Sequence, residues 1–453
     1  MKKTFLLLGD IIFLYAALLT ALFFRYSSSG WDYWSFVKIH LLPFTIIFIL
    51  WLIVFGAFEL YDFRFAKNSK LFFYKLFEAM IVNVALAAII FYLAPLEIEP
   101  RTNLFLIAAA SVFFTAGWRY LFNLFIVRAP SSKILFFGIN KDAIELADWF
   151  IKNPQLGQKP IAFMSANSGH EEETLSLPRP LFASTEDITH VVEDYKIDTI
   201  VILREIKENK ILVNALFQII PKGIAIMEFT PFFERFTGKV PLSLIGEVWF
   251  LENLVGIKRP AYEFFKRLTD IALAIIAGPP SLLIFPFIAL AIKLDSSGPV
   301  FYRQKRVGKN GKVFELIKYR SMVAGADKIE GLKQDGNDHR HTRVGKFLRK
   351  SYLDEFPQII NILKGDMSFI GPRPERPEYA RELKQKIPFY EMRTLVAPGI
   401  TGWAQVKMEN DASVEDAPEK MQYDLYYVKN RVFILDLLIA SRTIFAILQR
   451  QGR

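Results

Sequence analysis

The chain has 453 residues, which predicts two or three domains, and it contains no cysteine. The lack of cysteine excludes disulfide frameworks, thiolate metal sites and a cysteine nucleophile. Hydrophobic residues make up 52% of the chain and the mean hydropathy is +0.24, values that indicate membrane segments mixed with soluble ones. The net charge of +10 favours anionic partners, and residues 258–350 hold nineteen basic against eight acidic side chains. Anion binding is therefore expected in that stretch, with a merely solvated basic surface as the alternative.

Four long apolar runs open the chain, and each is long enough to cross a bilayer, which takes about 20 mostly apolar residues. The first run follows Lys2 and Lys3 as a secretory signal would, but it lacks a small-residue cleavage site and is expected to be a retained helix. Asp10 and Arg119 lie inside runs, where they are expected to face neighbouring helices or to snorkel. The four runs are 5–24, 36–58, 72–94 and 104–127.

Basic side chains in the short loops set the predicted orientation of this four-helix bundle. They concentrate before the first run, between the second and third, and after the fourth, whereas the other two loops are poorer in them. Both ends of the bundle are therefore expected in the cytoplasm, where the rest of the chain begins.

A fifth apolar run, 271–292, carries no charge and is also long enough to span the membrane. Basic residues flank both of its ends, which argues that both ends stay on the cytoplasmic side. Pro279, Pro280 and Pro286 lie within the run and are expected to break its helix. The pattern predicts a re-entrant helix over about 261–294 that dips into one leaflet and returns, with a straight fifth span as the alternative.

Residues from about 132 to 229 alternate between short apolar strands, such as "KILFFGIN", and helical patterns, such as "DAIELADWFIKN". This alternation predicts a small α/β domain with a parallel sheet. The first strand leads into Gly138, where a dinucleotide-binding fingerprint would have three glycines, so a structural or regulatory domain is favoured over a nucleotide-binding one. The following segment, 231–253, is expected to be an irregular connector.

The densest chemical signal is "RKSYLDEFPQIINILKGDMSFIGPRPE", in which Asp354 and Glu355 precede an apolar helix-like run. As an isolated pair they would simply favour the helix dipole. With basic neighbours they indicate phosphate chemistry, since one carboxylate can form a covalent phosphate intermediate and a second can hold Mg²⁺. Arginine and lysine side chains can clamp the transferred phosphate, and the candidates are Lys318, Arg320, Arg349 and Arg373.

Two further features have an ordinary explanation beside a functional one. His339 and His341 in "NDHRHTR" could form a metal pair, but a solvated loop is favoured because no third ligand is evident. Trp403 in "APGITGW" is expected either at the membrane interface or packed inside a loop.

These blocks, in their order, resemble the catalytic domain of the polyprenyl-phosphate sugar-1-phosphate transferases, the monotopic phosphoglycosyl transferases. The resemblance covers about 266–442 and rests on "KRLTDIALAII", "KLDSSGPVFYRQKRVGKNGKVFELIKYRSM", the Asp-Glu stretch, "APGITGWAQV" and "YDLYYVKN". It implies the architecture of the large members. These have four transmembrane helices (1–130), a degenerate Rossmann-like α/β domain (131–245) and an α/β-mixed catalytic domain with the re-entrant helix (246–453).

The resemblance also implies residue roles. Asp354 matches the nucleophile that takes the sugar phosphate, and Glu355 matches its dyad partner, implicated with Asp354 in binding Mg²⁺. The chain departs from the family in its membrane helix. In the family this helix breaks at a Ser-Pro pair, whereas the aligned residues here are Leu282 and Leu283. The basic and acidic residues that match substrate- or phosphate-binding positions are Lys318, Arg320, Arg349, Arg373 and Asp424, the last without an assignable role.

The implied reaction transfers a sugar 1-phosphate from a UDP-sugar to undecaprenyl phosphate at the cytoplasmic face of the bacterial inner membrane, releasing UMP. It would start exopolysaccharide, capsule or O-antigen assembly, with the lipid bilayer and a second copy of the chain as partners and no nucleic acid. The sugar is not identified by the motifs. Two alternatives remain, a nonenzymatic membrane scaffold or nucleotide sensor, and a membrane sugar epimerase or dehydrogenase, which would need the missing dinucleotide loop.

Overall fold

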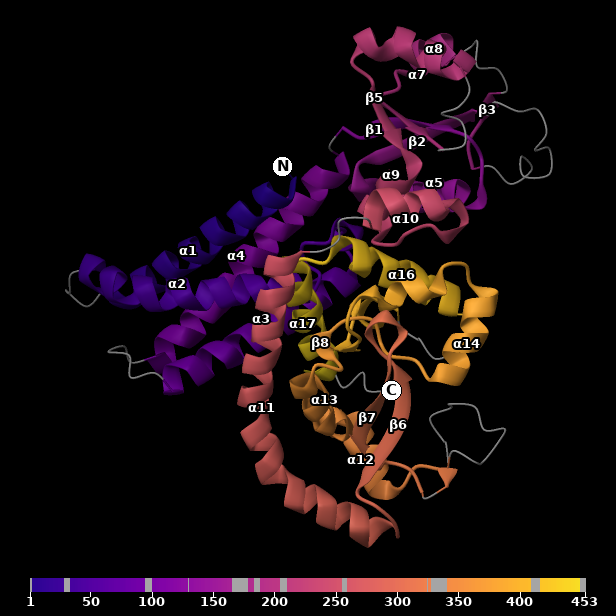
Figure 1. Ribbon diagram of the computed structural model, residues 1–453. Helices are drawn as coiled ribbons and strands as arrows, with labels where there is room; N and C mark the ends of the chain where they lie inside the picture. Colours follow the sequence, from indigo (N-terminus) through magenta and orange to yellow (C-terminus); the bar gives the residue numbers. More distant parts are fainter. Residues whose placement is uncertain are drawn as a thin grey trace. The chain divides into compact units, whose positions relative to one another are not determined.

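The computed structural model divides into two compact units, Met1–Phe232 and Phe233–Arg453, which are described separately (Figure 1). The described residues are 2–27, 33–93, 100–128, 130–164, 178–182, 188–203, 210–254, 259–323, 325–326, 340–408 and 416–448.

Four long helices form the first part of the first unit, and each contains one of the predicted apolar runs. Helix α1 packs against α4 and α2, and α3 packs against α2 and α4. Each is long and apolar enough to cross a membrane. The predicted four-helix bundle is therefore confirmed as α1 (Lys2–Tyr26), α2 (Tyr33–Ala57), α3 (Lys70–Leu93) and α4 (Pro100–Arg128).

The two charges inside this bundle neutralise each other. Arg119 of α4 donates to both carboxylate oxygens of Asp10 in α1, at 2.9 and 2.6 Å, and it also donates to the carbonyl oxygen of Leu60. Asp10 and Arg119 are at most 1% exposed. Because an isolated charge in an apolar bundle is costly, the pairing explains how both side chains are accommodated facing neighbouring helices, as expected.

The rest of the first unit is a five-stranded parallel sheet in the order β3-β2-β1-β4-β5. The predicted α/β alternation is confirmed, although β2 and β3 had not been recognised. After β1, Gly138 adopts a positive φ of 102° and Asn140 accepts from the backbone N–H of Ala143 at 2.7 Å, which caps α5 (Lys141–Lys152). The strands are β1 (Ser132–Phe137), β2 (Gln158–Met164), β3 (Leu181–Phe182), β4 (Thr199–Ile202) and β5 (Ala225–Glu228), with α7 (Ile188–Tyr195) and α8 (Lys210–Ile219) between them.

The segment expected to be an irregular connector is mostly helical, so that prediction was wrong. It contains most of α9 (Phe229–Thr237) and most of α10 (Glu247–Leu254). Trp249 and Phe250 of α10 are buried and pack in the core of the second unit with Leu425. Burial of its aromatic side chains against the rest of the unit stabilises the helices, an effect that a local sequence pattern does not show.

The second unit is built around the helix α11 (Pro260–Asp295) and a set of short elements that carry the sequence blocks named above (Figure 1). The antiparallel hairpin β6 (Phe301–Val307) and β7 (Val313–Tyr319) follows α11, and β8 (Ser368–Ile370) pairs in parallel with β9 (Gly399–Thr401). The helices are α12 (Arg343–Lys350), α13 (Ile359–Lys364), α14 (Pro377–Lys386), α15 (Trp403–Lys407), α16 (Ala417–Asn430) and α17 (Phe433–Leu448).

Helix α11 is continuous for 36 residues and passes through all three internal prolines, and Figure 1 shows it strongly curved. The expected break is therefore a bend, as proline produces when it removes a backbone donor. Near its beginning, Asp270 accepts from the Ser368 hydroxyl and the Phe369 backbone N–H at 3.0 and 3.1 Å. Near its end, Ile288 and Ile292 pack against β7 and α12. Both halves of α11 are thus attached to the same unit.

Candidate active site

The Asp-Glu pair lies on a short 3-10 helix, η9 (Leu353–Gln358), between α12 and α13. Tyr352, just before it, adopts a left-handed backbone with φ of 56°, a conformation that costs a non-glycine residue about 1–3 kcal/mol and is typical of functional sites. Leu353 and Phe356 pack into the hydrophobic cluster that includes Ile288 of α11. These contacts fix the position of the turn, in which Asp354 is only 8% exposed.

Glu355 joins three segments of the chain through one carboxylate oxygen. Lys318 Nζ, from β7, lies 2.8 Å from Glu355 Oε1, and Arg373 Nη2, from the "GPRP" turn, lies 3.1 Å from the same atom. Burial alone would raise the pKa of Glu355, but Arg373 and Lys318 outweigh it and hold the pKa at about 2. Glu355 is therefore ionised at neutral pH.

The pKa of Asp354 is shifted in the opposite direction. Burial raises the pKa of Asp354 to about 6, the negative charge of Glu355 adds to that effect, and the cations of Lys318, Arg349 and Arg373 only partly oppose it. Two adjacent carboxylates thus differ widely in proton affinity, a pattern that assigns them different roles. Near neutral pH, Asp354 is therefore a poorly solvated carboxylate.

Three of the predicted phosphate-binding cations are brought together at this pair. Lys318 and Arg373 contact Glu355 directly, and Arg349 on α12 acts on the charge of Asp354. Burial lowers the pKa of Lys318 from its ordinary value, although the carboxylate of Glu355 opposes this. The arrangement surrounds a reactive carboxylate with positive charge, as binding of a phosphate or diphosphate requires.

Arg320 is directed elsewhere. Its guanidinium donates to the backbone oxygens of Ser296 and Ser297, at 2.7 and 2.9 Å, just after the end of α11. These carbonyls follow the last turn of α11, where basic side chains bind favourably. The structure therefore places Arg320 as a cap on the membrane helix and not beside the Asp-Glu pair.

Asp424 is fully buried on α16 and forms an ion pair with Arg393, whose Nη2 lies 2.7 Å from the Asp424 carboxylate. Arg393 Nη2 also donates to the backbone oxygen of Arg373 at 2.9 Å, and its Nη1 donates to the Tyr390 hydroxyl. Asp424 therefore acts through Arg393 to fix the turn that presents Arg373. No sequence pattern indicated Arg393, because its partner lies 31 residues further along the chain.

Glycines bring the "GPRP" and "APGITG" blocks into backbone contact beside β8 and β9. A Cβ on Gly371 would lie 2.3 Å from the Ala397 carbonyl oxygen, and one on Gly399 would lie 2.1 Å from the Gly371 nitrogen. Only glycine permits this approach. Trp403, at the end of the second block, is buried and donates from Nε1 to the Gly238 carbonyl oxygen at 2.9 Å, so it is packed inside the unit and not at a membrane interface.

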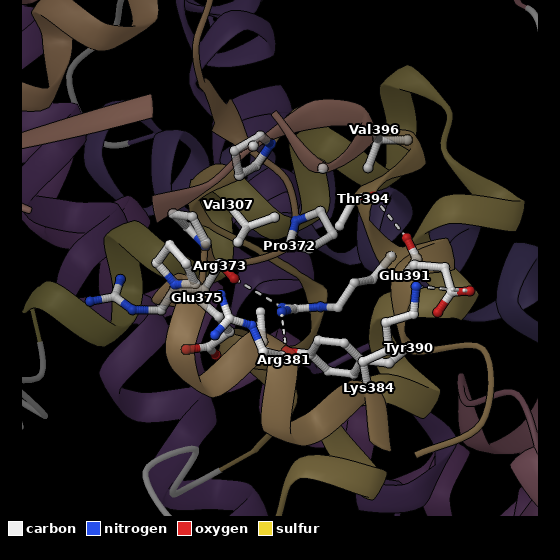
Figure 2. Close-up of a pocket in the computed structure, with 17 residues that line it drawn as sticks. Val307, Pro372, Arg373, Glu375, Arg381, Lys384, Tyr390, Glu391, Thr394 and Val396 are labelled. Carbon is white, nitrogen blue, oxygen red and sulfur yellow. Dashed lines mark hydrogen bonds and ion pairs between the residues drawn. The ribbon is translucent and has the colours of Figure 1, made fainter. Parts of the chain in front are cut away.

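A pocket of about 290 Å³ lies on the side of the "GPRP" turn that includes Arg373, Glu375 and Tyr390 (Figure 2). Proline and aliphatic side chains form much of its wall, and Arg381, Lys384 and Arg393 add positive charge. Arg373 belongs both to this pocket and to the Glu355 cluster. A ligand with a flat apolar part and an anionic part fits such a lining.

The metal prediction can be compared with the donors at the site. Among the described residues, no cluster of three or more His, Cys, Asp or Glu side chains is arranged to hold a metal. Mg²⁺ nevertheless often uses one or two carboxylates together with substrate phosphates, and Asp354 and Glu355 provide that donor set. His341 pairs with Arg349 instead of a metal, and His339 lies outside the described residues.

Comparisons with known proteins cover this part of the chain best. The family described as "Bacterial sugar transferase" matches residues 261–450. The chain is 42% identical over 221 residues to a "UDP-N-acetylgalactosamine-undecaprenyl-phosphate N-acetylgalactosaminephosphotransferase" of Aeromonas hydrophila, covering 48% of this chain and 51% of that relative.

Two glucose-1-phosphate transferases are also similar. A "UDP-glucose:undecaprenyl-phosphate glucose-1-phosphate transferase" of Escherichia coli is 42% identical over 199 residues, covering 42% of this chain and 41% of the relative. One of the same description from Klebsiella pneumoniae is 32% identical over 329 residues, covering 69% of this chain and 67% of the relative. The chain thus spans about half the length, or less, of the first two relatives and two thirds of the third.

Asp354 and Asp424 are both buried, and the close ion pair of Asp424 with Arg393 predicts opposite effects on stability when each aspartate is replaced. Asp354→Asn should raise the melting temperature at pH 7.5, because the ionised carboxylate costs on the order of 3 kcal/mol when its pKa rises from 3.8 to about 6. Asp424→Asn should lower it, since it leaves Arg393 buried without its counter-charge, at a cost of about 3–5 kcal/mol. Thermal unfolding of purified protein in detergent measures both, and equal shifts for the two variants would contradict this interpretation.

Proposed function

Because this chain belongs to the bacterial sugar transferase family, we propose that it transfers a sugar 1-phosphate from a UDP-sugar to undecaprenyl phosphate. The observation that carries this proposal is the buried carboxylate of Asp354, whose pKa is about 6, within a cluster of three cations. A hydrolase would need access for water, whereas the low exposure of Asp354 favours transfer between two bound substrates.

The proposed reaction has two displacement steps at phosphorus. In the first, an Asp354 oxygen attacks the β-phosphorus of the UDP-sugar, the bond from that phosphorus to the bridging oxygen breaks, and the electron pair leaves with UMP. In the second, a phosphate oxygen of undecaprenyl phosphate attacks the phosphorus of the phospho-aspartate. The acyl-phosphate bond breaks and the Asp354 carboxylate is regenerated, which leaves a polyprenyl diphosphate sugar.

The cations around Asp354 have distinct tasks in this scheme. Lys318 and Arg373 are held by Glu355 and face the transferred phosphate from two directions. Arg349 favours the ionised form of Asp354, which is the form that attacks. Mg²⁺ bound to Asp354, Glu355 and the donor's phosphates would neutralise negative charge on the diphosphate. Arg393 and Asp424 position Arg373 without contacting the substrate.

Helix α11 supports a membrane-bound site for the second substrate. Its length would reach about 54 Å if straight, well beyond the apolar thickness of a bilayer, yet both halves pack against the same unit. A bent, re-entrant helix satisfies both facts better than a straight span. Exposed apolar side chains on α12 and α13, Phe347, Ile360 and Leu363, lie on the helices that flank the Asp-Glu turn and would be covered by the cytoplasmic face of the membrane.

The reaction is tested by incubating membranes that contain the protein with undecaprenyl phosphate, Mg²⁺ and a panel of UDP-sugars. UMP release with one donor identifies the sugar. Asp354→Asn should abolish release, because the amide cannot attack phosphorus, whereas the surface variant Glu378→Gln should not change it. Full activity of a folded Asp354→Asn protein would refute the assigned nucleophile.

The rate should depend on pH through Asp354. The carboxylate form is the nucleophile and its pKa is raised to about 6, so kcat/KM should fall by at least tenfold per pH unit below pH 6 and level off above it. The measurement is UMP release at a fixed donor from pH 5 to pH 9 in a constant ionic-strength buffer. A rate that stays constant down to pH 5 would show that Asp354 titrates lower than its burial implies.

We also propose that the pocket beside Arg373 receives the nucleoside part of the donor. Ala380→Leu, which fills the pocket, should raise KM for the UDP-sugar about tenfold, the usual cost of a poorly fitting apolar contact. The second half-reaction, from isolated phospho-enzyme to undecaprenyl phosphate, should be unchanged. Glu378→Leu on the same helix is the matched control, and an equal effect there would count against the pocket.

A further inference from the structure

His341 precedes α12, and its ring contacts the two segments on either side of it. Its Nε2 lies 2.5 Å from Nη1 of Arg349, and its Nδ1 lies 3.3 Å from the backbone oxygen of Ser321, just after β7. Its backbone forms an antiparallel bridge with Met322. Gly345 of α12 approaches so closely that a Cβ would lie 1.9 Å from the Ser321 oxygen, so the three segments form one packed junction.

The partners of the ring determine its protonation state. A guanidinium has only donors, so Nε2 of His341 must accept from Arg349 and must carry a lone pair. The proton of the neutral ring is then on Nδ1, where it is donated to the Ser321 oxygen. Both hydrogen bonds are satisfied by one neutral tautomer and by no other form of the ring.

We propose that neutral His341 is a positioning residue that holds the Arg349 guanidinium beside Asp354. This role rests on the proposed transfer reaction, in which Arg349 favours the attacking carboxylate. Protonation of His341 would remove the acceptor for Arg349 and place a second positive charge beside it. The guanidinium would then move away from His341 and lose its fixed orientation toward the phosphate site.

The charged groups around the ring favour this response to pH. Arg340 and Arg343 lie on the same segment, and Arg320 follows β7. Asp295, at the end of α11, accepts from the Val344 backbone N–H at 2.8 Å and bonds the Thr342 side chain, so its charge is already engaged. Arg349 contacts the ring from α12. Protonation of the ring would therefore place a positive charge directly beside a guanidinium.

The test compares four proteins in nanodiscs, each checked for folding by thermal unfolding. They are the wild type, His341→Gln, His341→Ala and the exposed-surface control His190→Gln. The measurement is kcat and KM for UMP release from pH 5.5 to pH 9. Glutamine retains an acceptor for Arg349 without titrating in this range, whereas alanine removes the acceptor.

At pH 8, His341→Ala should lose about tenfold in kcat with little change in KM, and His341→Gln should stay within about threefold of wild type. On the acid side, the wild-type rate should fall more steeply than one proton allows, and His341→Gln should restore a slope of about one per pH unit. His190→Gln should follow the wild type throughout.

Two results would overturn the role of His341. One is a His341→Ala protein that matches wild type at every pH, and the other is a glutamine variant as impaired as alanine with an unchanged acid slope. Absence of UMP release from wild type with every donor would instead overturn the proposed reaction, and the role of His341 with it. An active wild type with unaffected variants would overturn this role alone.

Discussion

The arrangement of the site depends on the carboxylate of Glu355, which binds both Lys318 and Arg373. One oxygen receives Lys318 from a strand and Arg373 from a turn, while Glu355 itself belongs to the 3-10 helix that carries Asp354. Three segments distant in sequence therefore meet at a single buried charge. Two cations near one anion leave net positive charge at the surface of the cluster, and a diphosphate is the kind of ligand that would neutralise it.

Burying charged groups is costly, and Arg373 has a second attachment in addition to its bond to Glu355. Arg373 is fixed through its backbone by Arg393, which Asp424 neutralises. Burial alone would lower the pKa of Arg393, but the Asp424 carboxylate keeps that pKa above its ordinary value. The attachment is rigid because glycines bring the neighbouring backbones together, so Arg373 has little freedom to leave the site.

The sequence was informative where chemistry is local. Long apolar runs predict the four helices, and the residue types of Asp354, Glu355 and their basic neighbours indicate phosphate chemistry. It was uninformative where function depends on long-range pairing. In the sequence, Arg393 cannot be distinguished from a surface arginine, and only the fold shows its ion pair with Asp424. Arg320 is predicted to bind phosphate, but in the structure it binds the end of α11.

The segment 231–253 shows the same limit for the fold, because it is predicted to be an irregular connector but is mostly helical, with Trp249 and Phe250 buried. The sequence identifies these residue types, but no local pattern identifies the distant residues that they contact. Tertiary packing overrides propensity most readily in short segments, because a short helix has little stability of its own.

The turn η9, which carries Asp354, and the helix α11 share one hydrophobic cluster. A displacement of one would therefore move the other. Leu353 and Phe356 flank the Asp-Glu pair and pack with Ile288 and Ile292 of α11, together with Tyr319, the neighbour of Lys318 on β7. A close-packed cluster transmits displacement, because its side chains have no free volume to absorb it. A change in the bend of α11 would therefore move both the nucleophile and its nearest lysine. In the proposed reaction, the depth at which the bilayer holds this helix would therefore set the position of Asp354 relative to the lipid-linked acceptor.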